Sequence, residues 1–222
     1  MGTLRTDKIE YSEHRRTREK ALSYSTKYDR KLHKRISQWR ERRLLDAILR
    51  RTGRSGRILD VPSGPGRLSG VIAAHGERIF ESDYSVEMLK LCRRQACGYE
   101  PLPAAVTAFQ LPFRSRSFDL VVSIRLSHHI PDRSGRIEHL REMMRVARRF
   151  VLATFFGEET LKNRLHQLGN RLRRLKKGPK LTLCRAEVEG LARNEGFRTV
   201  CCKSLSSLFS GHYFVLLERT EG

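Results

Sequence analysis

The sequence of 222 residues predicts an α/β fold, a mostly parallel sheet with helices on both faces and an antiparallel pair of strands at its end. Two observations predict it. Apolar runs of strand length alternate with segments of helical periodicity, which is typical of parallel sheets. The last two apolar runs follow each other without an obvious helix between them, which indicates a hairpin-like end. The expected strands are residues 58–61, 78–80, 104–108, 118–124, 150–156, 197–202 and 212–218.

The expected helices are amphipathic, and several end at a glycine. The first begins at Arg30, repeats apolar residues at spacings of three to five, and ends at Gly53. Asp132 and Ser134 are candidate caps for a helix over 137–147. The other expected helices are residues 68–75, which Gly76 ends, 86–97, a basic segment at 158–177, and 186–194.

The charge of the chain is strongly positive and unevenly spread. The net formal charge is +21, from 45 Lys and Arg against 24 Asp and Glu. Residues 1–57 hold 18 basic and seven acidic residues, and residues 158–185 hold nine and two. A concentrated positive field attracts nucleic acid, anionic lipid or phosphorylated metabolites. An anionic partner and a merely solvated surface both remain open interpretations.

Several classes of protein are disfavoured by composition. No apolar run approaches the roughly 20 residues that cross a bilayer, and the first thirty residues are polar, so we expect a soluble cytoplasmic protein. The five cysteines are odd in number and form no Cys-x-x-Cys pair. A disulfide framework and a metal site are therefore not expected.

A glycine-rich turn follows the first expected strand. Residues 60–66 read Asp-Val-Pro-Ser-Gly-Pro-Gly and connect that strand to a helix. Such a turn lets a ligand approach the backbone closely, near a helix N-terminus. Read as a dinucleotide fingerprint, the turn has Ser69 where the third glycine belongs, which argues against a nicotinamide-dependent oxidoreductase.

An acidic residue follows the second expected strand at the spacing of a ribose ligand. Asp83 stands 23 residues after Asp60, and a carboxylate there can accept hydrogen bonds from two ribose hydroxyls. The alternative is an acid that only caps the helix beginning at Val86. The glycine turn at the expected separation favours nucleoside binding.

These pieces, with three later ones, resemble the S-adenosylmethionine (SAM)-dependent methyltransferases of the type 11 group. The later pieces are Leu-Pro-Phe at 111–113, Ser-Phe-Asp at 117–119 and the pair His128-His129. The resemblance implies a Rossmann-like seven-stranded sheet with an antiparallel last strand, SAM as cofactor, and methyl transfer. It also implies a methyltransferase domain over 57–222 that follows a basic helical extension over 1–56 and carries a basic helical insertion at about 158–183.

The resemblance also implies which residues hold the cofactor. The turn would wrap the amino-acid end of SAM, Asp83 would hold the ribose hydroxyls, and Tyr84 would lie against the adenine or ribose. Pro62 replaces the usual glycine, Thr107 replaces a frequent acid, and Arg125 is unusual beside a sulfonium. The expected cofactor-binding residues are Asp60, Pro62, Ser63, Gly64, Pro65, Gly66, Asp83, Tyr84, Thr107, Ala108, Phe109, Ser123, Ile124, Arg125 and Leu126.

The sequence gives fewer indications of the catalytic and substrate-binding residues than of the cofactor-binding ones. His128 and His129 follow the fourth expected strand, and histidine, with an unperturbed pKa of ~6.5, suits a general base. Because adjacent residues point to different sides, we expect one of them to face the cleft, as a base or as a structural residue. Tyr24, Tyr28, Arg171 and Arg174 are the candidate substrate contacts in the two basic segments.

Three functions follow from these observations. The leading one is methyl transfer to an anionic small-molecule or lipid-linked acceptor. An RNA methyltransferase is the nearest alternative, although few aromatic residues accompany the basic segments to stack on bases. The other is a non-catalytic protein of the same fold that binds nucleic acid or an anionic surface through its charge.

Overall fold

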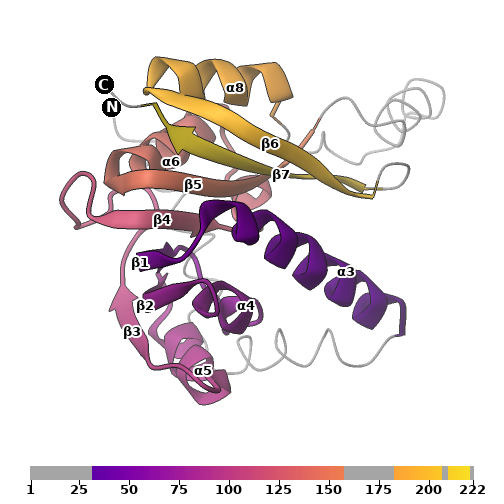
Figure 1. The fold of residues 1–222 in the computed structure, drawn as a ribbon, viewed down its shortest axis with the longest axis vertical. Coiled ribbons are helices and arrows are strands. Elements are labelled where there is room, and N and C mark those ends of the chain that lie inside the picture. Colours follow the sequence, from indigo (N-terminus) through magenta and orange to yellow (C-terminus); the bar gives the residue numbers. More distant parts are fainter. Residues whose placement is uncertain (1–31, 158–182, 207–209, 221–222) are drawn as a thin grey trace.

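The computed structural model describes residues 32–157, 183–206 and 210–220, and its centre is a seven-stranded sheet of order β3-β2-β1-β4-β5-β7-β6 (Figure 1). Strand β7 pairs antiparallel with β5 and β6, and the other pairings are parallel. The predicted fold class is therefore confirmed. The strands are β1 (Ser55–Asp60), β2 (Gly76–Asp83), β3 (Pro101–Ala105), β4 (Phe118–Ser123), β5 (Ala147–Phe156), β6 (Phe197–Ser206) and β7 (Ser210–Arg219).

Helices cover both faces of the sheet. On one face, α6 and α8 bury residues such as Met143 and Val188 against β4, β5 and β7. On the other, α3 and α4 bury residues such as Ile48 and Ile72 against the same strands. Each central strand is therefore apolar on both sides, as the short apolar runs predict. The helices are α3 (Leu32–Leu49), α4 (Ser69–Ala73), α5 (Val86–Gln95), α6 (Arg133–Val146) and α8 (Arg185–Asn194), with 3-10 turns η1 (Arg50–Thr52) and η2 (Ser127–His129).

The C-terminal half of α3 belongs to the core of the sheet domain. Leu45, Ile48 and Leu49 are at most 2% exposed and pack with residues of β1 and β4. Its N-terminal half projects on the side of the molecule where β4 and β5 end (Figure 1). Among the described residues, no helix is both long enough and apolar enough to cross a membrane.

One sequence expectation differs from the structure in detail, and another lies outside the described residues. Gly76 does not merely end a helix, because it is the first residue of β2. A Cβ atom there would lie 2.5 Å from Ile58 Cδ1, so the glycine lets β2 approach β1 closely. The expected basic helix at 158–177 falls within 158–182, outside the described residues.

The N-terminus of α6 has a single side-chain cap. Asp132 Oδ1 accepts the backbone N–H of Gly135, and the hydroxyl of Ser134 donates to the same oxygen. Asp132, rather than Ser134, is therefore the cap of the two candidates. This matters for the site because α6 follows η2 directly.

We expect Asp132→Ala to lower the free energy of unfolding by about 1 kcal/mol, because two α6 donors then lose their acceptor. Urea denaturation followed by circular dichroism measures this. Asp132→Asn, which keeps an acceptor oxygen, is the matched control and should stay close to wild type. Equal stability of the two variants would contradict the assignment of the cap.

Candidate functional site

A cavity of about 460 Å³ opens where β1, β2 and β4 end. Open α/β sheets place ligands at such carboxyl edges. The predicted residues that line it are Asp60, Pro62, Ser63, Gly64, Pro65, Asp83, Tyr84, Thr107, Ala108, Phe109, Ile124, Arg125, Leu126 and His129. Residues without a predicted role also line it, among them Arg67, Ser85, Gln110, Ile130 and Glu138.

The glycine turn uses its two glycines differently. Gly64 has φ +56°, and no atom beyond its two chain neighbours lies within 4 Å of where its Cβ would be. Gly66 has φ +84°, and its Cβ would lie 2.6 Å from Cys92 Sγ and 3.1 Å from Cys92 Cα. Gly66 thus packs the turn against α5 and is not among the lining residues, whereas Gly64 leaves open space beside the cavity.

Asp83 joins two turns at the edge of the cavity. Its Oδ2 accepts the N–H of Gly64 at 3.1 Å, and its Oδ1 accepts the N–H of Ser85 at 2.8 Å. The N-cap of α5 is Ser85, whose hydroxyl accepts the N–H of Met88 at 3.4 Å. Asp83 is therefore more than the helix-capping acid of the alternative interpretation, and its carboxylate is held in place on the cavity wall.

Two further carboxyl groups lie buried beneath the turn. Burial raises the pKa of Asp60 well above its ordinary value, and the nearby charges of Glu81 and Asp83 raise it further, against the hydrogen bond from Ser69. Glu81 accepts the Cys92 thiol at 2.6 Å and the Tyr99 hydroxyl at 2.8 Å. Burial also raises the pKa of both donors, so they keep the protons that they donate.

A buried carboxylate of α3 holds two arginines that line the cavity. Glu41 is fully buried, and its Oε2 accepts Arg67 Nη1 at 2.6 Å while its Oε1 accepts Arg125 Nε at 2.7 Å. Burial raises the pKa of Glu41, but the two guanidinium groups outweigh it and hold the pKa below its ordinary value. Arg125 has φ +64°, and its N–H donates to Thr154 Oγ1 at 2.7 Å.

The two candidate histidines lie in η2 and have different surroundings. His129 lines the cavity. His128 is not among the lining residues, and its ring packs edge-on against Phe156, with centroids 4.8 Å apart. His212 lies next to His128, and burial together with the charge of Arg125 lowers its pKa to about 3, so it is neutral near pH 7.

Ser123 supports the site from inside the protein. Its hydroxyl pairs with Nε2 of the buried His139 at 2.9 Å, and Nδ1 of His139 pairs with the carbonyl of Ala108 at 2.9 Å. Ser123 is therefore not among the lining residues, and it connects β4 through α6 to the loop that carries Thr107, Ala108 and Phe109. Burial lowers the pKa of His139.

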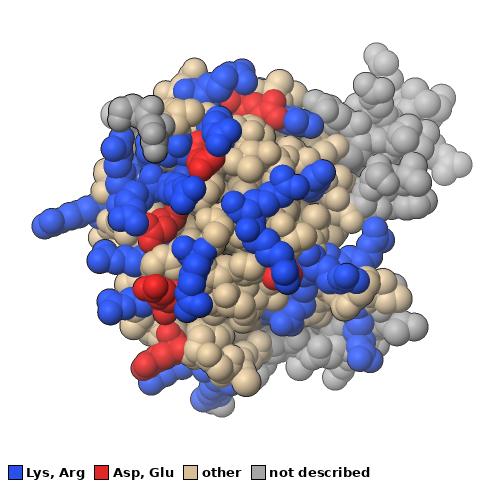
Figure 2. All heavy atoms as spheres, in the orientation of Figure 1, with Lys and Arg blue, Asp and Glu red and all other residues tan. Residues whose placement is uncertain are grey.

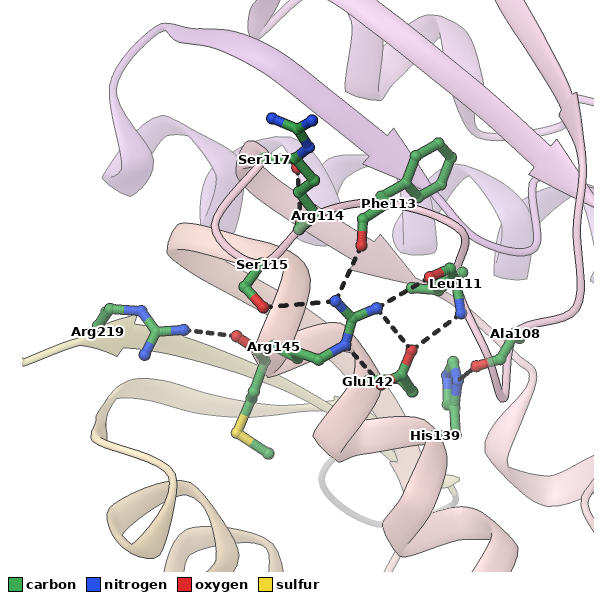
Figure 3. Close-up of polar contacts among 11 residues, drawn as sticks. Ala108, Leu111, Phe113, Arg114, Ser115, Ser117, His139, Glu142, Arg145 and Arg219 are labelled. Atoms are coloured by element: carbon green, nitrogen blue, oxygen red, sulfur yellow. Dashed lines mark hydrogen bonds and ion pairs between the residues drawn. The ribbon is translucent and has the colours of Figure 1, made fainter.

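The loop after β3 is held at a second point by α6 (Figure 3). Arg145 donates to the carbonyls of Leu111 and Phe113 at 2.9 Å each, and Glu142 accepts the N–H of Leu111 at 2.9 Å. The Leu-Pro-Phe segment thus fixes a wall of the cavity without lining it.

Some residues of the candidate site were missed by sequence reasoning, and some predicted ones lie outside the described residues. Glu41 and Arg67 carry no motif, and only the fold brings them to Arg125. Tyr24, Tyr28, Arg171 and Arg174 lie outside the described residues.

A family model and a curated relative each match part of the chain. The type 11 model, described as a methyltransferase domain, matches residues 59–151. A demethylmenaquinone methyltransferase from Clavibacter sepedonicus is 35% identical over 101 residues, which cover 45% of this chain and 41% of that protein. The match thus spans about two fifths of that relative's length.

Solved structures share the fold. The SAM-bound magnesium protoporphyrin IX methyltransferase from Synechocystis is similar with a TM-score of 0.71 and 14% identity, over 96% of this chain and 97% of that one. A SAM-dependent methyltransferase from Methanosarcina mazei is similar with a TM-score of 0.60 and 19% identity, over 76% and 94%.

We expect Glu41→Gln to lower the free energy of unfolding by on the order of 3 kcal/mol at pH 7, because two partly buried guanidinium groups lose their counter-charge. A carboxyl whose pKa is lowered by folding contributes stability that is complete above its unfolded value and is lost as the pH falls through the folded value. The difference from wild type should therefore shrink below about pH 4.5, the ordinary value for Glu41.

Urea denaturation at a series of pH values measures this difference. Glu189→Gln removes the exposed pair with Arg185 on α8 and is the matched control, with an effect of at most about 0.5 kcal/mol. A pH-independent difference for Glu41→Gln would contradict the charge-based account.

Proposed function

We propose, for a chain whose residues 59–151 belong to the type 11 methyltransferase family, that it transfers a methyl group from SAM to an anionic small-molecule or lipid-linked acceptor. One observation carries the proposal. A single cavity brings together the glycine turn, the fixed carboxylate of Asp83, and the two arginines held by Glu41. The first two suit a nucleoside cofactor, and the arginines suit an anion.

S-adenosylmethionine is the cofactor, and the cavity fits it. Its volume of about 460 Å³ is in the range of small-molecule sites. Gly64 leaves open space at the turn, and the buried Ser63 hydroxyl has no hydrogen-bond partner among the described residues. Both features suit a ligand that lies against the backbone of the turn.

Each wall of the cavity takes one part of this cofactor in our proposal. The turn from Asp60 to Gly66 holds the amino-acid end, and Asp83 accepts the ribose hydroxyls. Tyr84 lies against the ribose or adenine, with Thr107, Ala108 and Phe109 bordering the base. The residues from Ser123 to Leu126 flank the end that carries the methyl group, with Ser123 acting from behind through His139.

The acceptor end of the cavity lies at Arg67, Arg125 and His129. When bound, SAM supplies a methyl group on a sulfonium, so the protein mainly has to position the acceptor. The arginines orient an anionic acceptor, and their connection to Glu41 keeps them in place. The imidazole of His129 takes the proton that an oxygen or nitrogen acceptor loses, and His128 supports it by ring packing, with centroids 4.0 Å apart.

We expect calorimetric titration to detect micromolar binding of SAM and of its demethylated product, and none of NAD. Asp83→Ala should weaken SAM binding at least tenfold, because the loss of two charge-assisted hydrogen bonds costs more than about 1.4 kcal/mol. Asp46→Ala, which removes a half-buried carboxylate paired with His75 and Arg50 outside the cavity, is the control. Binding of NAD alone would overturn the proposed function.

We expect His129→Gln to lower kcat about 100-fold with SAM affinity unchanged, because it removes the base and leaves the cofactor contacts in place. Transfer of a labelled methyl group to demethylmenaquinone, magnesium protoporphyrin IX and total RNA identifies the acceptor used for the assay. His128→Gln is the matched variant and should keep kcat within a few-fold. Equal losses in both variants would argue for a structural role of the pair.

A further inference from the structure

The N-terminal half of α3 exposes two large apolar side chains. Ile36 is 52% exposed and Trp39 is 56% exposed, and both come from one helix. At i and i+3 they lie on the same face. Large apolar side chains gathered on an exposed face commonly mark a binding surface.

Arginines surround this apolar pair. Helical spacing places Arg35, Arg42 and Arg43 on the face of Trp39, and all three are exposed. The Arg43 guanidinium carbon lies 4.9 Å from the centre of the Trp39 ring. The acid of this stretch, Glu41, is fully buried on the opposite side of the helix. Among the described residues no acid forms an ion pair with these three arginines, so the face combines apolar area with positive charge.

We propose that this face of α3 docks on an anionic lipid surface. Tryptophan prefers the headgroup level of a bilayer, a branched aliphatic side chain prefers the acyl boundary, and arginines attract anionic headgroups. Lys and Arg side chains also spread over the surrounding surface of the molecule (Figure 2), which extends the attraction to anions. Ile36 distinguishes lipid from RNA as the partner, because RNA offers it no apolar surface while a bilayer does.

The docking face is joined to the cavity by ion pairs of α3. Glu41 lies within the same turn as Trp39 and binds Arg67 and Arg125, which line the cavity. Arg40 Nη2 also donates to the carbonyl of Leu205 on β6 at 3.5 Å. Docking would then bring the acceptor end of the site, to which α3 is fixed, to the bilayer that holds a lipid-linked acceptor. This last step rests on the proposed function, whereas docking itself does not.

The test uses Trp39, which is the single tryptophan of the chain. Fluorescence of the full-length protein is recorded with vesicles of phosphatidylcholine alone and of phosphatidylcholine with equimolar phosphatidylglycerol, and binding is quantified by co-sedimentation. We expect the emission to shift to the blue with the anionic vesicles and to stay unchanged with the neutral ones. Emission that stays unchanged with both vesicles would overturn the proposal, as would binding of RNA with quenching but no binding of vesicles.

Paired variants separate this face from net charge. Each arginine near an anionic surface contributes about fivefold in affinity, so Arg42→Gln with Arg43→Gln should weaken vesicle binding about 25-fold. Arg93→Gln with Arg94→Gln removes two exposed arginines from α5 and is the matched control, which should stay within a few-fold of wild type. Ile36→Ser keeps the fluorescent reporter and should reduce the blue shift.

Equal weakening by both double variants would overturn the proposal in favour of diffuse attraction. SAM titration of each variant keeps the two proposals distinguishable. Loss of vesicle binding with intact SAM binding concerns the α3 face alone. Vesicle binding without SAM binding would contradict the proposed function and leave docking in place.

Discussion

The site depends on how the protein accommodates carboxyl groups buried at the carboxyl edge of its sheet. Asp60 and Glu81 end or nearly end β1 and β2, and both are at most 3% exposed. A buried carboxylate is costly unless hydrogen bonds replace its water. Glu81 receives them from Cys92 on α5 and from Tyr99 after α5, so satisfying this acid also fixes α5 against β2. The approach of the turn at Gly66 to Cys92 then becomes possible, and it brings Gly64 within hydrogen-bond distance of Asp83.

The buried carboxylate of Glu41 is stabilised by opposite charges instead of neutral donors. Glu41 forms ion pairs with two guanidinium groups, and these arginines come from the two segments that follow β1 and β4. One acid of α3 therefore holds together the helix and two cavity walls. The cavity consequently has the carboxylate of Asp83 at the turn and the guanidinium groups of Arg67 and Arg125 at the other end. This separation of charge suits a cofactor whose ribose hydroxyls lie on the acidic side and an anionic acceptor on the basic side.

The elements and the turn could be predicted from the sequence because they depend on neighbouring residues. Apolar periodicity predicted each described strand and helix within a few residues of its position. The glycines and prolines of the segment from Asp60 to Gly66 predicted the turn. Glu41 could not be predicted, since it meets Arg125 across 84 positions and lies in a helix whose other charged residues are mostly basic. Ser123 was expected to contact the cofactor, but its hydroxyl pairs with the buried His139 of α6. No sequence motif includes His139, so this contact could not be predicted. Gly76 was read as a helix end because its close contact with Ile58 exists only once the strands pair.

The topology explains why the end of the cavity proposed for the cofactor was easier to recognise than the end proposed for the acceptor. In the order β3-β2-β1-β4-β5, strands β2 and β3 lie on one side of β1, whereas β4 and β5 lie on its other side. Ligand crevices form at the point where the strand order reverses in this way, here between β1 and β4. On the side of β1 and β2, the walls come from turns directly after each strand, so contiguous motifs describe them. On the side of β4, the lining residue Arg125 is held by Glu41 of α3, a helix that precedes the whole sheet in the chain. A family motif can therefore specify the side proposed for the nucleoside, while the side proposed for the acceptor depends on a helix that lies before residue 59, where the family match begins.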